Sequence, residues 1–199
     1  QPINADLTAI ADTWIVTLAG TLWGLVLSNN GTDATNDIDI AAGIAIDSTN
    51  AVLMRLASSL TKRLDAAWAV GSGNGGRDTG SIADGTWHVH LIKRPDTGVV
   101  DVLFSLSATA PTLPTNYTVF RRVGSIIRTG GAIKAFTQFG NYFEWVTPVV
   151  DINGASQGTT KTDRTLGSVP AGIRVMVDIA IYQDRTATSS SAISVGSPA

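Results

Sequence analysis

Short runs in which apolar and polar residues alternate dominate the chain and predict β-strands. The clearest runs are residues 23–28, 37–46, 87–92, 99–105, 119–128, 132–139 and 173–181. The alternation over residues 173–181 is the strongest and predicts a central strand with one face in the core. Shorter strands are expected at residues 14–18, 149–153 and 193–195. Many short strands separated by turns indicate an all-β fold, an antiparallel, jelly-roll-like β-sandwich.

Turn-forming residues set the order of the strands between residues 85 and 145. The sequence Pro95-Asp96-Thr97-Gly98 predicts a hairpin, and so does Gly130-Gly131, because glycine accepts the positive φ values of tight turns. Gly140-Asn141 marks a third turn. Residues 110–114 contain two prolines, which cannot donate ladder hydrogen bonds, so a connection is expected there, between two sheets for example.

Three segments are less clearly patterned. Residues 51–70 fit either an amphipathic helix or a short strand followed by a loop with one helical turn, since apolar residues recur every three or four positions. Residues 71–84 predict a polar surface loop. Residues 1–12 predict an N-terminal arm or linker, helical or extended. The rest of the chain, residues 13–199, is expected to be a single β-sandwich domain.

Composition excludes several classes of function. Only 15% of the 199 residues are charged, and the chain contains no cysteine, so disulfides, a thiol nucleophile and cysteine metal sites are absent. The basic residues are too dispersed to predict nucleic-acid binding. The most apolar window, residues 14–27, is shorter than a membrane-spanning helix and contains two glycines, so no membrane insertion is expected.

Candidate catalytic motifs lack the setting that their chemistry needs. Residues 71–76 match G-x-G-x-x-G without a following helix, and residues 154–158 match G-x-S-x-G around Ser156 without a later histidine. His88 and His90 would share a strand face, and Asp101 is the obvious third metal ligand, but surface or subunit-facing histidines are the favoured interpretation. Asp101 and Glu144 are the carboxylates considered for glycoside cleavage. We therefore predict no catalytic, cofactor or metal residues.

Aromatic side chains and the two histidines remain as candidate contacts with a receptor or glycan, because aromatic rings stack on sugars. These candidates are Trp87, His88, His90, Tyr117, Tyr142 and Tyr182.

Three long stretches resemble a domain of tail fibres and related tail proteins of tailed bacteriophages and prophages. They read LTKRLDAAWAVGSGNGG from Leu60, TWHVHLIKRPDTGVVDVLFS from Thr86, and the run from Ala108 to Trp145 that includes LPTNYTVFRRVGSIIRTGGAIKAF. The opening INADLTAIA is similar to linkers in such fibres. Together the quoted stretches make up about two fifths of the chain and supply no catalytic motif of the family, and no repetitive fibre shaft is present.

The resemblance implies a non-enzymatic structural protein of the virion, assembled in the bacterial cytoplasm. It further implies a fibre or spike domain that forms a homotrimer, contacts other tail or capsid proteins, and binds a glycan or protein on the host surface. A glycan- or ester-cleaving tailspike enzyme and a capsid-attached fibre or decoration protein are the alternatives. None of these roles follows from composition or spacing alone.

Overall fold

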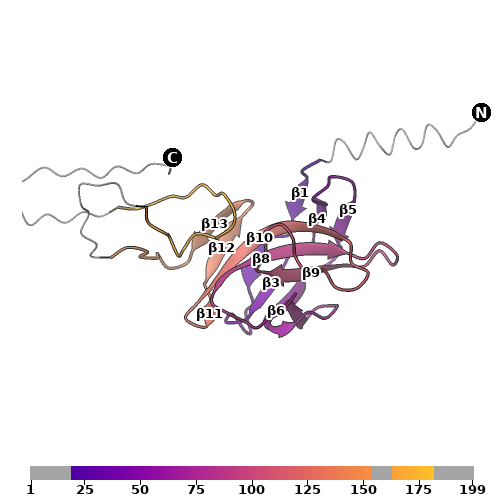
Figure 1. Ribbon diagram of the computed structural model, residues 1–199, viewed down its shortest axis with the longest axis horizontal. Coiled ribbons are helices and arrows are strands. Elements are labelled where there is room, and N and C mark those ends of the chain that lie inside the picture. The colour runs from indigo at the N-terminus through magenta and orange to yellow at the C-terminus, as the bar shows by residue number, and fades with distance from the viewer. Residues whose placement is uncertain (1–18, 154–162, 182–199) are drawn as a thin grey trace, which may run out of the picture.

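The computed structural model describes residues 19–153 and 163–181 (Figure 1), and these residues contain thirteen β-strands and no helix. The fold is all-β and sandwich-like, as predicted. The strands are β1 (Leu22–Gly24), β2 (Leu27–Asn29), β3 (Asp37–Ile40), β4 (Gly43–Ile46), β5 (Leu53–Leu56), β6 (Leu60–Ala67), β7 (Asn74–Arg77), β8 (Gly85–Lys93), β9 (Val100–Ser105), β10 (Val119–Thr129), β11 (Ala132–Ile133), β12 (Phe136–Phe139) and β13 (Tyr142–Trp145).

The strands form one large sheet and two small ones. The large sheet has the order β11-β10-β8-β9-β7-β6-β3-β2, the second sheet the order β1-β4-β5, and the third is the β12–β13 hairpin. The large sheet curves until its ends approach each other, and the Ile133 N–H donates to Thr35 O over 2.9 Å (Figure 1). The main core fills the space that the sheets enclose and includes Leu27, Leu64, Trp87 and Phe104.

One bent hairpin joins the large sheet to the three-stranded sheet. Strands β1 and β2 pair with β4 and β3, and the chain passes between sheets at Gly24 and Leu25, which both have positive φ. The hydrogen bond from Ala41 N–H to Val26 O, 2.9 Å long, keeps the two arms together across the bend. The predicted strand at residues 37–46 is therefore divided by a bend into β3 and β4.

The turn chemistry between residues 85 and 145 is confirmed. Gly98 closes the β8–β9 hairpin with φ of 74°, Gly130 and Gly131 close β10–β11 with φ of 60° and 83°, and Gly140 closes β12–β13 with φ of 58°. The proline-containing connection joins β9 to β10. Because β8 lies between these two strands, the connection stays within one sheet and crosses β8 instead of linking two sheets.

Residues 51–70 form two strands, so the helix is wrong, and the alternative is right only in its short strand, because β6 takes the place of the loop with a helical turn. The apolar residues Leu56, Leu60 and Leu64 are four positions apart, and a spacing of four suits both one helical face and one strand face. Burial distinguishes the two, because β6 buries Leu60, Lys62 and Leu64 at alternate positions.

The predicted loop at residues 71–84 contains a strand of the large sheet. Strand β7 pairs in parallel with β6 and with β9, which also departs from a fully antiparallel sheet. Its central residues are Gly75 and Gly76, which give no apolar alternation. A Cβ on Gly76 would lie 2.7 Å from Phe104 Cδ2, so the strand fits there because it lacks a side chain.

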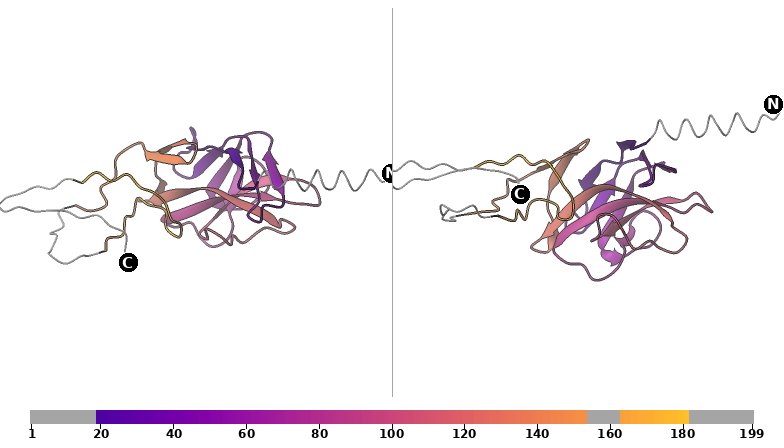
Figure 2. Two further views of the ribbon diagram at one scale, coloured as in Figure 1. Left: turned by 90° about the horizontal axis from the view of Figure 1, so that it is seen from above. Right: turned by 45° about the horizontal axis from the view of Figure 1, so that its top comes forward.

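The predicted central strand at residues 173–181 is wrong, and so is the strand at residues 149–153. Neither segment forms a strand within the described residues, and their side chains are mostly exposed. Residues 163–181 lie beside the β12–β13 hairpin at one end of the β-domain (Figure 2). Alternation specifies a strand with an apolar face, but it does not specify which edge pairs with that strand.

Several predicted features lie outside the described residues. They are the arm at residues 1–12, the strands at residues 14–18 and 193–195, and the G-x-S-x-G motif around Ser156.

Candidate functional site

The structure buries four of the six side chains predicted to contact a receptor. Trp87, His88, His90 and Tyr117 are buried, so they are not accessible on the described surface, and the expected exposure of the histidines is corrected. Only Tyr142, 50% exposed at the β12–β13 turn, is accessible. Tyr182 lies outside the described residues.

The connection between β9 and β10 explains why β8 is buried on both faces. Trp87, Val89 and Leu91 point into the main core, whereas Ile92 packs with Leu103 and Tyr117 in a second cluster on the opposite face. Leu113 from the connection packs against this second cluster, so the connection covers the outer side of the sheet. The sequence alternation of β8 did not reveal this cover.

The two histidines take part in internal hydrogen bonds. His88 Nδ1 lies 2.9 Å from Ser125 Oγ, and His90 Nε2 lies 3.0 Å from Ser107 O, so His90 Nε2 carries the proton and donates. Burial lowers the pKa of His90 to about 4, although the bond to Ser107 opposes this shift. Burial and, next, Arg122 lower the pKa of His88. Both rings are therefore neutral at pH 7.

A buried ion pair crosses the sheet between β6 and β9. Lys62 Nζ lies 2.9 Å from Asp101 Oδ1, and the two side chains are 0% and 2% exposed. Lys62 also donates to Ala69 O and Gly71 O over 2.6 and 3.0 Å, and Asp101 accepts from the Gly71 and Val102 N–H groups over 2.7 and 2.6 Å. Burial lowers the pKa of Lys62, and Asp101 opposes that shift.

This ion pair has a structural role, since it fixes residues 69–71 against the sheet. Asp101 is fully engaged by Lys62 and two backbone N–H groups, so it has no free oxygen for the metal site considered with His88 and His90. No group of three or more metal-ligating side chains occurs in the part of the chain that the structure describes. A single lysine within an alternating strand was the only sequence signal for the pair.

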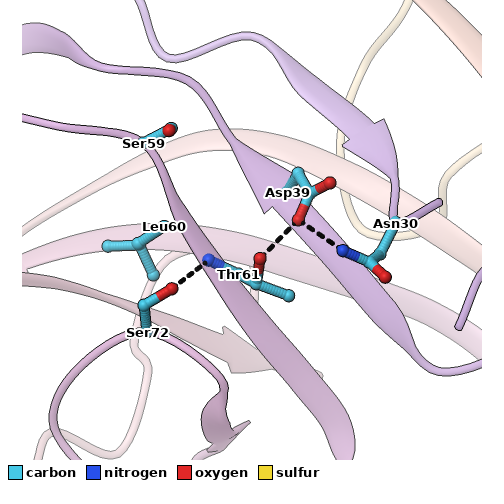
Figure 3. A pocket seen from close by; sticks show the side chains of 6 residues that line it. All are labelled: Asn30, Asp39, Ser59, Leu60, Thr61 and Ser72. Carbon is cyan, nitrogen blue, oxygen red and sulfur yellow. Dashed lines mark hydrogen bonds between the residues drawn. The ribbon is translucent and has the colours of Figure 1, made fainter. Parts of the chain in front are cut away.

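An open polar cavity of about 330 Å³ lies where β3, β6 and the loop after β6 meet (Figure 3). Its lining residues are Asn30, Asp39, Ser59, Leu60, Thr61 and Ser72. The alternation of β3 places Asp39 on the face opposite Ile38 and Ile40, which are buried in the core. The sequence patterning thus indicated that Asp39 is polar-facing, but not that it lines a cavity.

Hydrogen bonds hold the polar groups of this cavity in place. Asp39 Oδ1 accepts from Asn30 Nδ2 over 2.8 Å and from Thr61 Oγ1 over 2.5 Å (Figure 3). Asn30 Oδ1 in turn accepts the Thr32 and Asp33 N–H groups, which fixes the amide. Ser72 Oγ accepts the Thr61 N–H over 2.9 Å.

The lining of the cavity offers both hydrogen-bond donors and acceptors. One carboxylate supplies acceptors and the serine hydroxyls supply donors, and the volume lies at the lower end of the range for small-ligand sites. The lining contains no histidine, lysine or second carboxylate, so it has no general acid and base pair.

Exposed apolar side chains follow the β-domain. Val146, Val150 and Ile152 are exposed directly after β13, and five apolar side chains are exposed between residues 175 and 181. Two hydrogen bonds locate this part of the chain: Ser168 N–H donates to Asp151 Oδ1 over 2.9 Å, and Ala171 N–H donates to Thr86 Oγ1 over 3.0 Å. Exposed large apolar side chains that recur along one part of a chain are a feature of protein interfaces.

No family model matches the chain, and no curated protein or solved structure matches it either. The described residues contain no helix that is long and apolar enough to cross a membrane.

Proposed function

We propose that this chain is a non-enzymatic structural protein of a tailed-bacteriophage virion, a fibre or spike domain that assembles with further copies and contacts the host surface. The sequence stretches that resemble tail-fibre proteins begin at Leu60 and end at Trp145, and they coincide with β6 to β13. The resemblance therefore concerns the part of the chain that builds most of the large sheet.

The observation that carries this proposal is the exposed apolar segment after the β-domain. A chain that acts alone exposes few contiguous apolar side chains, whereas a subunit of an assembly covers them with its neighbours. The virion is an assembly in which such a surface has a partner. A homotrimer held by the N-terminal segment and one apolar sheet face is the proposed arrangement, and other tail or capsid proteins are the proposed neighbours.

The alternative of a glycan- or ester-cleaving spike receives less support. Cleavage by a carboxylate pair requires two accessible groups, and Asp101 is buried against Lys62. Glu144 on β13 is exposed, but Asp101, the second carboxylate considered for cleavage, is not accessible to a substrate. A capsid-attached fibre or decoration protein shares the assembly chemistry and differs only in its position on the particle.

Host-surface binding is the second proposed function, and the polar cavity carries it. Asp39 and the serine hydroxyls suit the hydroxyl groups of a surface polysaccharide. This site replaces the buried residues of β8 as the candidate glycan contact.

Antibody labelling of intact phage particles tests the virion role. Label on the tail supports a fibre or spike, label on the head supports the capsid-attached alternative, and unlabelled particles overturn the proposal. Incubation with host polysaccharide tests the rest: we expect binding that Ser59→Ala weakens, with no release of reducing ends. Release that is lost in Glu144→Gln would instead establish the enzyme.

A further inference from the structure

Residues 173–181 combine a strand pattern with an exposed position. Ile173, Val175, Val177, Ile179 and Ile181 alternate with Arg174, Met176, Asp178 and Ala180. The segment is not part of any sheet within the described residues, and Met176 is 99% exposed. It starts two residues after Ala171, whose N–H donates to Thr86 Oγ1 at the start of β8. The segment therefore leaves the β-domain from a fixed point.

The side chains of this segment favour pairing with another strand. β-Branched residues occupy every second position, and such residues are enriched in strands because they pack well on a pleated surface. An extended segment also offers unpaired N–H and C=O groups along both edges, which pair readily with a second chain. The remaining question is which chain supplies the second strand.

The charges of the segment answer this question. Its only charged residues are Arg174 and Asp178, which lie two positions before and two positions after Met176. In an antiparallel pair of two identical segments centred on Met176, each Arg174 is opposite Asp178 of the second copy. Val175 is then opposite Val177, and Ile173 is opposite Ile179. Opposite charges directly across two strands are favourable, and β-branched pairs add to them.

A parallel, in-register pair of the same segments brings like charges together. It places Arg174 opposite Arg174 and Asp178 opposite Asp178, and like charges directly opposite are destabilising. Of these two arrangements, only the antiparallel pair centred on Met176 places opposite charges across from each other.

We propose that residues 173–181 become a β-strand by pairing antiparallel with the same segment of a second copy of this chain, about a two-fold axis at Met176. Such an isologous contact by itself yields a dimer. Added to the three-fold contact of the proposed homotrimer, it joins two trimers, so the particle contains six chains. The inference rests on the assembly part of the proposed function, and a particle of three chains would show that the trimer forms without this two-fold contact.

Charge exchange tests the pairing in the full chain. We expect the dissociation constant of the two-fold contact, measured by analytical ultracentrifugation over a concentration series at low salt, to rise about tenfold or more in Arg174→Asp and in Asp178→Arg. Each single change places like charges opposite each other twice. The double variant Arg174→Asp, Asp178→Arg restores both pairs and returns the constant to within about threefold of the original. Arg164→Asp, an exposed control outside the segment, leaves it unchanged.

Crosslinking provides an independent measurement, because the chain has no cysteine of its own. In Met176→Cys the two thiols face each other across the axis at about 5 Å between Cα atoms, which suits a disulfide, so mild oxidation yields a covalent dimer. Ala180→Cys is the matched control on the same face. Its two thiols are separated by about eight residues of strand, roughly 26 Å, and remain unlinked.

Several outcomes overturn the proposal. They are a monomer at 100 μM (about a hundredfold above a micromolar contact), a particle of three chains, a double variant as weakened as the single ones, or equal crosslinking at positions 176 and 180. Circular dichroism and thermal unfolding verify that each variant is folded. Unlabelled phage particles would refute the virion role without affecting this pairing, and loss of pairing would leave the labelling result standing.

Discussion

Acidification tests the buried environment of His90. The ring is fully buried and neutral, with its pKa lowered from 6.5 to about 4, so the unfolded chain binds a proton in a pH range where the folded chain does not. The free energy of unfolding therefore falls as the pH decreases from about 6.5 towards 4. Above this range the contribution is complete, and below pH 4 it has been lost.

The magnitude follows from the difference in pKa. A difference of one pKa unit corresponds to about 1.4 kcal/mol. With the values 6.5 and about 4, His90 lowers the free energy of unfolding by about 2 kcal/mol at pH 5 and by about 3 kcal/mol at pH 4, relative to pH 7.5. A loss of this size is a large part of the stability of an ordinary domain.

Urea unfolding at pH 7.5, 5 and 4 measures this effect when the original protein is compared with His90→Gln. The glutamine keeps an N–H donor for Ser107 O and does not titrate, while His88 and the carboxylates are common to both proteins. Relative to pH 7.5, we expect the difference between the free energies of unfolding of the two proteins to change by about 2 kcal/mol at pH 5 and by about 3 kcal/mol at pH 4. Identical pH dependence in both proteins would refute the argument that burial holds His90 neutral.

Two further predictions concern the sheet. Lys62→Met leaves Asp101 buried without its cation and lowers the free energy of unfolding by about 3–5 kcal/mol, whereas the double variant Lys62→Met, Asp101→Leu recovers most of this loss in urea unfolding. An unaltered stability in the single variant would show that the pair is not desolvated. Gly76→Ala places a Cβ 2.7 Å from Phe104 Cδ2 and lowers the free energy of unfolding by about 1–3 kcal/mol. Gly31→Ala, where nothing lies within 4 Å, is the control and changes it by less than about 0.5 kcal/mol; equal effects would contradict the close packing.

The candidate site shows how far residue types alone can lead. Aromatic and histidine side chains were predicted as receptor contacts because of what they can bind, yet Trp87 is buried in the main core and His90 lies beneath the connection that crosses β8. Asp39 and Ser72 come from distant parts of the chain and have ordinary sequence surroundings. Only the pairing of β3 with β6 brings Asp39 next to Thr61 and creates the cavity.

The sequence by itself determined the all-β class and the hairpins, because turn residues such as Gly98 and Gly130 act on their own neighbours and period-2 alternation is a local property. It did not determine which strands pair across long distances. The parallel insertion of β7, the cover over β8 and the exposed position of residues 173–181 depend on contacts between residues far apart in the chain. Alternation indicates a strand with one apolar face, but it does not specify the partner strand, because pairing depends on contacts between distant residues.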